Sequence, residues 1–154
     1  MLNNIKTYVI NVFKYFDRHR VIYRDDNVPY LERYYIFLRE RNNFPFNIFI
    51  HKFLESDTDD IHDHPWDFFT IILWGGYWEY TKSDNYEKDK SLEKKWHGPL
   101  SFRYCKAEMF HKIIIDKKKS CWTLFIPFKQ RKDWGFIKDG KWISNVIYNS
   151  KKRT

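Results

Sequence analysis

Two alternating histidines, His62 and His64, together with the nearby Asp67, are the residues of this sequence best suited to chemistry. In an extended segment, side chains two positions apart point to the same face, so both imidazoles can face one cation. Neutral imidazole binds zinc, iron, nickel and copper, and an adjacent carboxylate favours the two-histidine, one-carboxylate set of non-haem iron. The alternative is a solvated polar turn, because Pro65 and the local aspartates also suit a turn.

The segment that follows the histidines predicts two strands. An apolar, aromatic run over residues 68–74 leads to Gly75 and Gly76, and a second aromatic run covers residues 77–80. Paired glycines between two such runs are typical of a tight turn in a β-hairpin. We therefore expect the histidines at the mouth of a hairpin.

This segment resembles the first motif of the cupin superfamily, in which two alternating histidines are followed by a glutamate and then a glycine. His62, His64 and Gly75 or Gly76 fall on that pattern. The glutamate position is occupied by phenylalanine, and Asp67 is the acidic residue nearest to it. More narrowly, the chain is similar to small uncharacterised cupin-like proteins of phages and bacteria that share the run His-Asp-His-Pro-Trp-Asp, a resemblance that brings no known reaction with it.

The second cupin motif contributes one further histidine, and His111 matches it at the start of the apolar run 111–115. The resemblance implies one divalent metal bound by His62, His64 and His111, with Asp67 as a candidate fourth ligand. Iron is the metal expected first, and zinc, manganese and nickel are the alternatives.

The resemblance leaves several functions open. The leading hypothesis is an iron-dependent, oxygenase-type enzyme that acts on a small polar molecule at the open metal positions. A metal-dependent sugar isomerase or epimerase is the second. The third is a noncatalytic module that binds an anionic ligand or nucleic acid, since a fold does not decide a reaction.

Other residues are candidates for substrate handling. Glu79 shares strand parity with Tyr77, so both can line the cavity, with Glu79 as a general base or else an exposed rim carboxylate. His51 is a candidate proton carrier or a hydrogen-bonded core histidine. Arg33 and Arg103 lie in strand-like runs, where a buried guanidinium needs a carboxylate partner or an anionic substrate. By contrast, His19 is predicted to be exposed and His97 to lie in a turn.

Length and composition predict one mainly β domain. The chain has 154 residues, and its aromatic content of 21% suits pleated, half-buried surfaces. Short apolar runs separated by turn residues favour a β-sandwich or barrel, and the cupin resemblance implies a jelly-roll barrel over about residues 21–148. Apolar residues at helical spacing predict an amphipathic helix over residues 3–18 that packs on the barrel, with a membrane-surface helix as the alternative.

The charge, the cysteines and the absence of long apolar runs indicate which partners and which compartment to expect. The net charge of +8 allows attraction to polyanions, but the basic clusters are few. They are residues 117–119, which we expect at a hairpin tip, a group at 129–132 and a tail at 151–153. No nucleic-acid recognition motif is present, so nucleic acid is not the favoured partner. Cys105 and Cys121 are expected to be buried thiols. No membrane span or secretion signal is indicated, which predicts a cytoplasmic protein, and a homodimer would cover the sheet edges.

Overall fold

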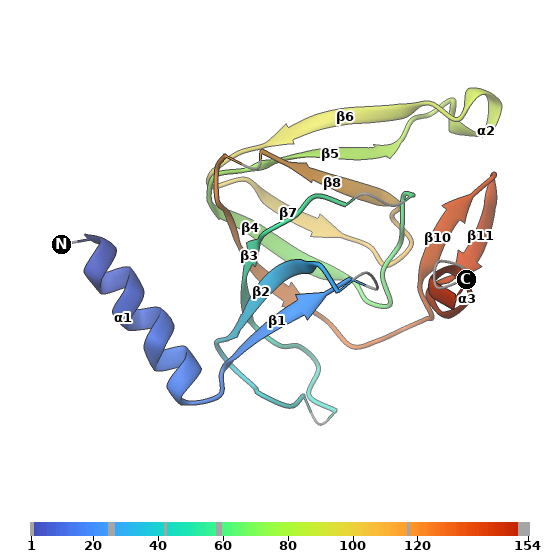
Figure 1. The fold of residues 1–154 in the computed structure, drawn as a ribbon. Coiled ribbons are helices and arrows are strands. Elements are labelled where there is room, and N and C mark those ends of the chain that lie inside the picture. Colours follow the sequence, from blue (N-terminus) through green and yellow to red (C-terminus); the bar gives the residue numbers. More distant parts are fainter. Residues whose placement is uncertain (1, 25–26, 42, 58–59, 117, 151–154) are drawn as a thin grey trace.

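The computed structural model describes residues 2–24, 27–41, 43–57, 60–116 and 118–150, and it confirms a mainly β fold with an N-terminal helix (Figure 1). Within these ranges the strands form a six-stranded sheet in the order β1-β2-β3-β9-β4-β7, a three-stranded sheet in the order β6-β5-β8, and the hairpin β10-β11. All of the pairings are antiparallel. The elements are α1 (Leu2–Tyr15), β1 (His19–Tyr23), β2 (Pro29–Tyr35), β3 (Phe49–Phe53), β4 (Phe68–Trp74), β5 (Tyr77–Lys82), α2 (Tyr86–Asp89), β6 (Leu92–His97), β7 (Phe102–Cys105), β8 (His111–Ile115), β9 (Cys121–Pro127), β10 (Gly135–Lys138), β11 (Lys141–Ser144) and α3 (Asn145–Ser150).

The hydrophobic core lies between the two larger sheets. Figure 1 shows the layer of β5, β6 and β8 above β4 and β7. Strands β3 and β8 alternate strictly between buried and partly buried positions, which is the pattern of strands with one face toward a core. The buried cluster draws on both sheets: Leu31, Phe53, Ile72 and Cys121 from the larger, and Tyr77, Ile113 and Ile115 from the smaller.

The glycine pair joins two strands, as predicted, but these strands do not form a hairpin. β4 pairs with β7 and β9, whereas β5 pairs with β6 and β8, so the turn carries the chain from one sheet to the other. Gly75 and Gly76 have φ angles of 75° and 152°. A Cβ atom on Gly76 would lie 2.6 Å from the carbonyl oxygen of His97. Glycine is therefore needed both for the backbone conformation and for this close approach.

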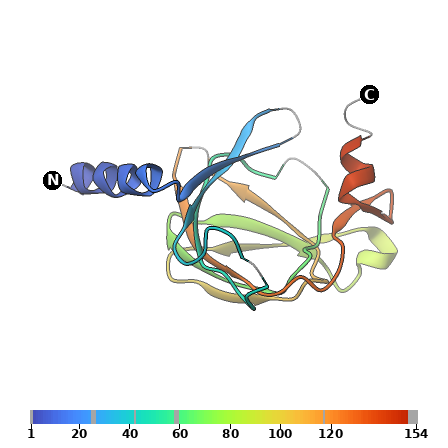
Figure 2. The same ribbon diagram turned by 90° about the horizontal axis from the view of Figure 1, so that it is seen from below.

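Helix α1 differs from its prediction in length and in packing. It begins at Leu2 and ends at Tyr15, because Asp17 adopts a left-handed conformation (φ 51°) and Arg18 N bonds to Phe13 O at 2.7 Å, as in a Schellman cap. Both views show the helix projecting away from the barrel (Figures 1 and 2). Phe13 contacts the edge of Tyr34, with ring centroids 5.6 Å apart, whereas Ile5 is 57% exposed.

The remaining predictions about organisation have mixed outcomes. Cys105 and Cys121 are buried free thiols, and burial raises the pKa of each to about 11. The segment around lysines 117–119 is not a hairpin tip, because β8 and β9 belong to different sheets; Lys117 itself and the tail at 151–153 lie outside the described residues. No helix among the described residues is long and apolar enough to cross a membrane.

Candidate metal centre

The two alternating histidines lie in the segment between β3 and β4, which runs extended beside β8. The backbone N–H of His62 donates to His111 O and the N–H of His111 donates to His62 O, both at 2.9 Å. The N–H of His64 donates to Ala107 O at 3.1 Å. Because this segment is extended, His62 and His64 share a face, as predicted, and both line the same cavity.

Asp63, between the two histidines, points the other way and anchors the segment. Its side chain is 1% exposed, and Oδ1 accepts the backbone N–H of Gly135 at 2.7 Å. Oδ2 accepts from Trp142 Nε1 at 3.3 Å and from Lys132 Nζ. The sequence analysis named the local aspartates only in its alternative of a polar turn and did not predict this role. Asp63 ties the histidine segment to the β10-β11 hairpin.

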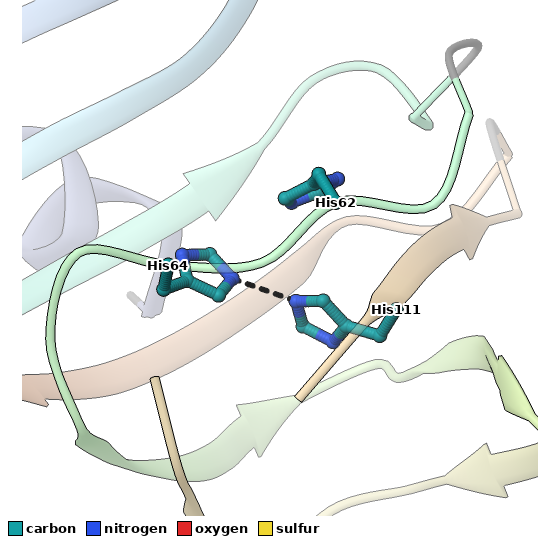
Figure 3. A group of neighbouring side chains, drawn as sticks. All are labelled: His62, His64 and His111. Carbon is teal, nitrogen blue, oxygen red and sulfur yellow. Dashed lines mark hydrogen bonds between the residues drawn. The ribbon is translucent and has the colours of Figure 1, made fainter. Parts of the chain in front are cut away.

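The three predicted histidines converge. Among the described residues, His62, His64 and His111 form a group whose ligand atoms all lie within 4.8 Å of one another (Figure 3). The Nε2 atoms of His64 and His111 are 2.7 Å apart, and Figure 3 shows these two rings pointing at each other. Burial lowers the pKa of His64 well below its ordinary value, with the neighbouring His111 and His62 acting in the same direction. Three imidazoles at this spacing fit a divalent metal ion, which binds their unprotonated nitrogens.

Glu79 supports the centre from behind His111. Its Oε1 lies 2.5 Å from His111 Nδ1 and 2.7 Å from an Arg103 nitrogen, and its Oε2 lies 3.2 Å from His97 Nε2. Since Nδ1 donates its proton to the carboxylate, the lone pair of His111 is on Nε2, which faces the other histidines. Burial alone would raise the pKa of Glu79, but the bonds from His111 and Arg103 outweigh it and lower the pKa.

These contacts decide between the two readings of Glu79. The side chain is 3% exposed, so it is not a rim carboxylate. It is also absent from the cavity lining, and its Oε1 contacts Nδ1 of His111 instead. Arg103 forms an ion pair with Glu79, and it also donates to the hydroxyl of Tyr77 at 3.4 Å. Arg103 is therefore a support of the centre and is absent from the cavity lining.

Asp67, the candidate fourth ligand, lies outside the histidine group. Its oxygens accept from Arg131 at 2.7 and 2.6 Å, from Tyr104 at 3.1 Å and from the backbone of Ala107 at 2.7 Å. Burial acts to raise the pKa of Asp67, yet the bonds from Ala107 and Arg131 lower it overall. Asp67 is absent from the cavity lining, and its carboxylate pairs with Arg131.

A cavity of about 300 Å³ opens beside the histidines. Most of its lining is aromatic or aliphatic, including Phe53, Phe68, Phe125, Trp66 and Trp134. The polar side chains at the wall include the three histidines together with Arg33, His51, Tyr77, Thr70 and Thr123. A volume of this size is at the low end for small-molecule sites.

His51 and Arg33 form a pair in this wall. They are cross-strand partners in β3 and β2, and Arg33 Nε donates to His51 Nε2 at 3.0 Å. Burial, followed by the charge of Arg33, lowers the pKa of His51 well below its ordinary value. His51 is therefore a neutral acceptor that positions Arg33, which matches the alternative of a hydrogen-bonded buried histidine.

The other two histidines were placed wrongly by the sequence reading. His97 ends β6 and is buried at 6% exposure beside Glu79, so it is not a turn residue. His19 begins β1, and its partly buried ring lies 3.4 Å from Glu32. Neither partner is close in sequence, so no local pattern indicated these contacts.

The fold is cupin-like, as its likeness to solved structures shows. A cupin-2 domain protein from Rhodospirillum rubrum aligns with a TM-score of 0.58 at 10% identity, covering 79% of this chain and 75% of that one. The polyketide cyclase RemF from Streptomyces resistomycificus aligns with a TM-score of 0.56 at 12% identity, covering 79% and 78%. At such identities the likeness concerns the fold.

A third similar structure is an epoxidase. The hydroxypropylphosphonic acid epoxidase from S. wedmorenis aligns with a TM-score of 0.53 at 14% identity. The alignment covers 73% of this chain and 56% of the epoxidase, so the chain spans little more than half of that enzyme's length. Neither the family models nor the curated proteins compared with the sequence gave a match.

Proposed function

We propose that the protein is a divalent-metal enzyme of the oxygenase type, with iron held by His62, His64 and His111. The observation that carries this proposal is the convergence of three imidazoles at the wall of a cavity, one of them oriented by a buried carboxylate. Three protein ligands leave coordination positions for substrate and oxygen, whereas a structural metal site is usually closed by four. One of the solved structures with a similar fold contains HppE in its Fe(II) form, which supports iron as the first metal to test.

The chain's own residues would prepare this chemistry. Glu79 keeps the proton of His111 on Nδ1, so the Nε2 lone pair stays available to a metal. Asp63 fixes the extended segment that carries His62 and His64. When bound, the metal would act as a Lewis acid and electron donor toward substrate and oxygen.

The nature of the lining refines the expected substrate. The sequence reading expected a small polar molecule, but aromatic and aliphatic side chains make up most of the wall. We therefore propose a small substrate with an apolar body and a polar group at the metal. A sugar isomerase reaction is less well supported, because a sugar needs hydrogen-bond partners along its whole length.

The experiment is a metal analysis of protein made without a polyhistidine tag, followed by loading with Fe(II) under anaerobic conditions. We expect about one iron per chain and binding of nitric oxide, a spectroscopic probe for open iron positions. His62→Ala and His111→Ala should each lose the iron, while His19→Ala, a histidine outside the cavity, should retain it. Iron that binds equally well to His111→Ala would refute the proposed centre. Iron that binds without taking up nitric oxide would favour a noncatalytic role.

A further inference from the structure

Arg33 has an unusual environment for a guanidinium. It is partly buried in β2 and lines the apolar cavity. Its neighbours are the neutral His51 ring, which accepts from Nε, and the face of Phe49, whose centroid is 4.6 Å from Cζ. Among the described residues, no carboxylate forms an ion pair with it. A buried cation of this kind is costly unless an anion meets it.

The other arginines near the centre differ in this respect. Arg103 pairs with Glu79 at 2.7 Å, and Arg131 pairs with Asp67 and Glu108. Burial lowers the pKa of Arg33, and the neighbouring Tyr35 only partly offsets it, whereas the pKa of Arg103 is raised. Within the described residues, Arg103 and Arg131 therefore have carboxylate partners, whereas Arg33 in the cavity wall has none.

No carboxylate in the cavity wall takes this role. Asp57 is the acidic residue of the described lining, and both of its oxygens are engaged. Oδ1 accepts from Tyr30 and Oδ2 accepts from the backbone of Ile113, each at 2.6 Å. Arg33 is thus oriented by His51 through Nε and by a side-chain hydrogen bond to Tyr35, and no carboxylate of the described chain forms an ion pair with its guanidinium.

Arg33 and the histidines belong to one continuous cavity. The His51 ring lies 4.8 Å from that of Phe125, Phe125 lies 4.9 Å from Phe68, and Phe68 lies 4.9 Å from His64, measured between centroids. An aromatic wall therefore connects the cationic group to the metal ligands. A molecule that reaches from one to the other would have an anionic end and an apolar body.

We infer that the substrate is a small carboxylate whose carboxyl group binds Arg33 while its reacting group faces His62, His64 and His111. A guanidinium fork matches the two oxygens of a carboxylate, and the apolar surroundings strengthen the pair. His51 is a positioning residue, since its ring fixes Arg33 Nε and stacks on Phe125. This inference rests on the proposed function, because it names the substrate class of the same site.

The test compares benzoate with benzamide, which have the same shape but differ in charge. Binding is measured by nuclear magnetic resonance titration of the full chain, both iron-loaded and metal-free. We expect benzoate to bind about tenfold more tightly than benzamide, because one charged hydrogen-bonding partner is gained. Arg33→Met should abolish this preference, and Arg33→Lys should retain only part of it.

A matched control is Arg20→Met, because Arg20 is the exposed cross-strand partner of Arg33 in β1 and should leave the preference unchanged. If Arg33→Met does not fold, as judged by circular dichroism, Arg33→Gln replaces it.

The metal-free protein separates this inference from the proposed function. A benzoate preference that persists without metal and disappears in Arg33→Met supports the Arg33 site, whatever the metal content. A preference that survives in Arg33→Met but requires iron would mean that the carboxylate binds the metal, and the inference would be wrong. Equal binding of benzoate and benzamide to the native protein would also overturn it, while the iron analysis would still judge the metal centre on its own.

Discussion

At the scale of single residues, the centre depends on which carboxylate contacts a histidine and which contacts an arginine. Glu79 and Asp67 are both acidic residues near the histidines, yet only Glu79 bonds to one of them. The difference follows from their partners: the bonds to Asp67 come from Arg131, Tyr104 and a backbone amide. The two residues should therefore respond differently to the loss of charge.

Glu79→Gln should weaken iron binding by about 10- to 100-fold, the range found when a carboxylate behind a metal-binding histidine is lost. Gln can still accept a bond from His111 Nδ1, but without the negative charge that makes the ring a stronger ligand. Competition with a chelator of known affinity measures this change. Arg103→Met is the control, because it also breaks the buried ion pair but retains the Glu79 bond to His111. Equal losses in both variants would show that the effect is only structural.

Asp67→Asn should leave the iron content unchanged. The pKa of Asp67 is lowered by its bonds, so the carboxylate is ionised at neutral pH and pairs with the half-exposed Arg131. Loss of this pair should reduce the free energy of unfolding by about 1 kcal/mol, as for a partly exposed ion pair. Metal analysis and urea unfolding measure the two quantities. Loss of iron in this variant would mean that Asp67 does serve as the fourth ligand.

At the scale of elements, the histidine segment is held between β8 on one side and the β10-β11 hairpin on the other. His62 forms isolated bridges to both His111 and Phe136. Asp63 adds side-chain bonds to the hairpin, and Gly135 lies so close to the backbone of Ile143 that a Cβ atom would meet it. The positions of His62 and His64 therefore depend on the β10-β11 hairpin, which follows them much later in the sequence.

Asp63→Ala should destabilise the protein by about 2 to 3 kcal/mol, because buried donors lose a charged acceptor. Iron affinity should fall as well, since the segment that carries His62 and His64 is no longer fixed to the hairpin. Asp133→Ala, which removes an exposed carboxylate just before β10, is the control and should change neither quantity. Thermal unfolding with and without iron measures both. Native-like iron affinity in Asp63→Ala would remove this aspartate from the site.

At the scale of the whole molecule, the fold keeps the buried His51 and the partly buried His64 neutral, which couples stability to pH. The pKa values of His51 and His64 in the folded protein lie well below 6.5, because burial penalises the charged form. In the unfolded chain each histidine takes up a proton near pH 6.5. As the pH falls below about 6.5, protonation therefore favours the unfolded state.

The free energy of unfolding of the metal-free protein should thus fall between pH 7 and pH 5, by up to about 1.4 kcal/mol per pH unit for each such histidine. Urea unfolding at several pH values in the presence of a chelator measures the slope. His51→Gln, which can still accept from Arg33, should show a shallower slope than the native chain. A stability that does not change over this range would contradict the neutral state of these rings.

Homodimer formation and a cytoplasmic location stay predictions.

The sequence by itself determined the local geometry of the site. Alternation with period two places His62 and His64 on one face wherever the segment is extended, and the start of an apolar run places His111 at the beginning of a strand. Aromatic content and regular turn signals likewise indicated a mainly β barrel. These features depend on neighbours a few residues away, so they can be derived from the sequence.

Only the tertiary structure decided how the charges are paired. Glu79 meets His111 and Arg103, while Arg33 meets no carboxylate of the described chain, and these facts follow from which strands lie side by side. The glycine turn that changes sheets separates strands that a local reading would pair. Contacts across sheets depend on packing of the whole barrel, and no spacing in the sequence encodes them.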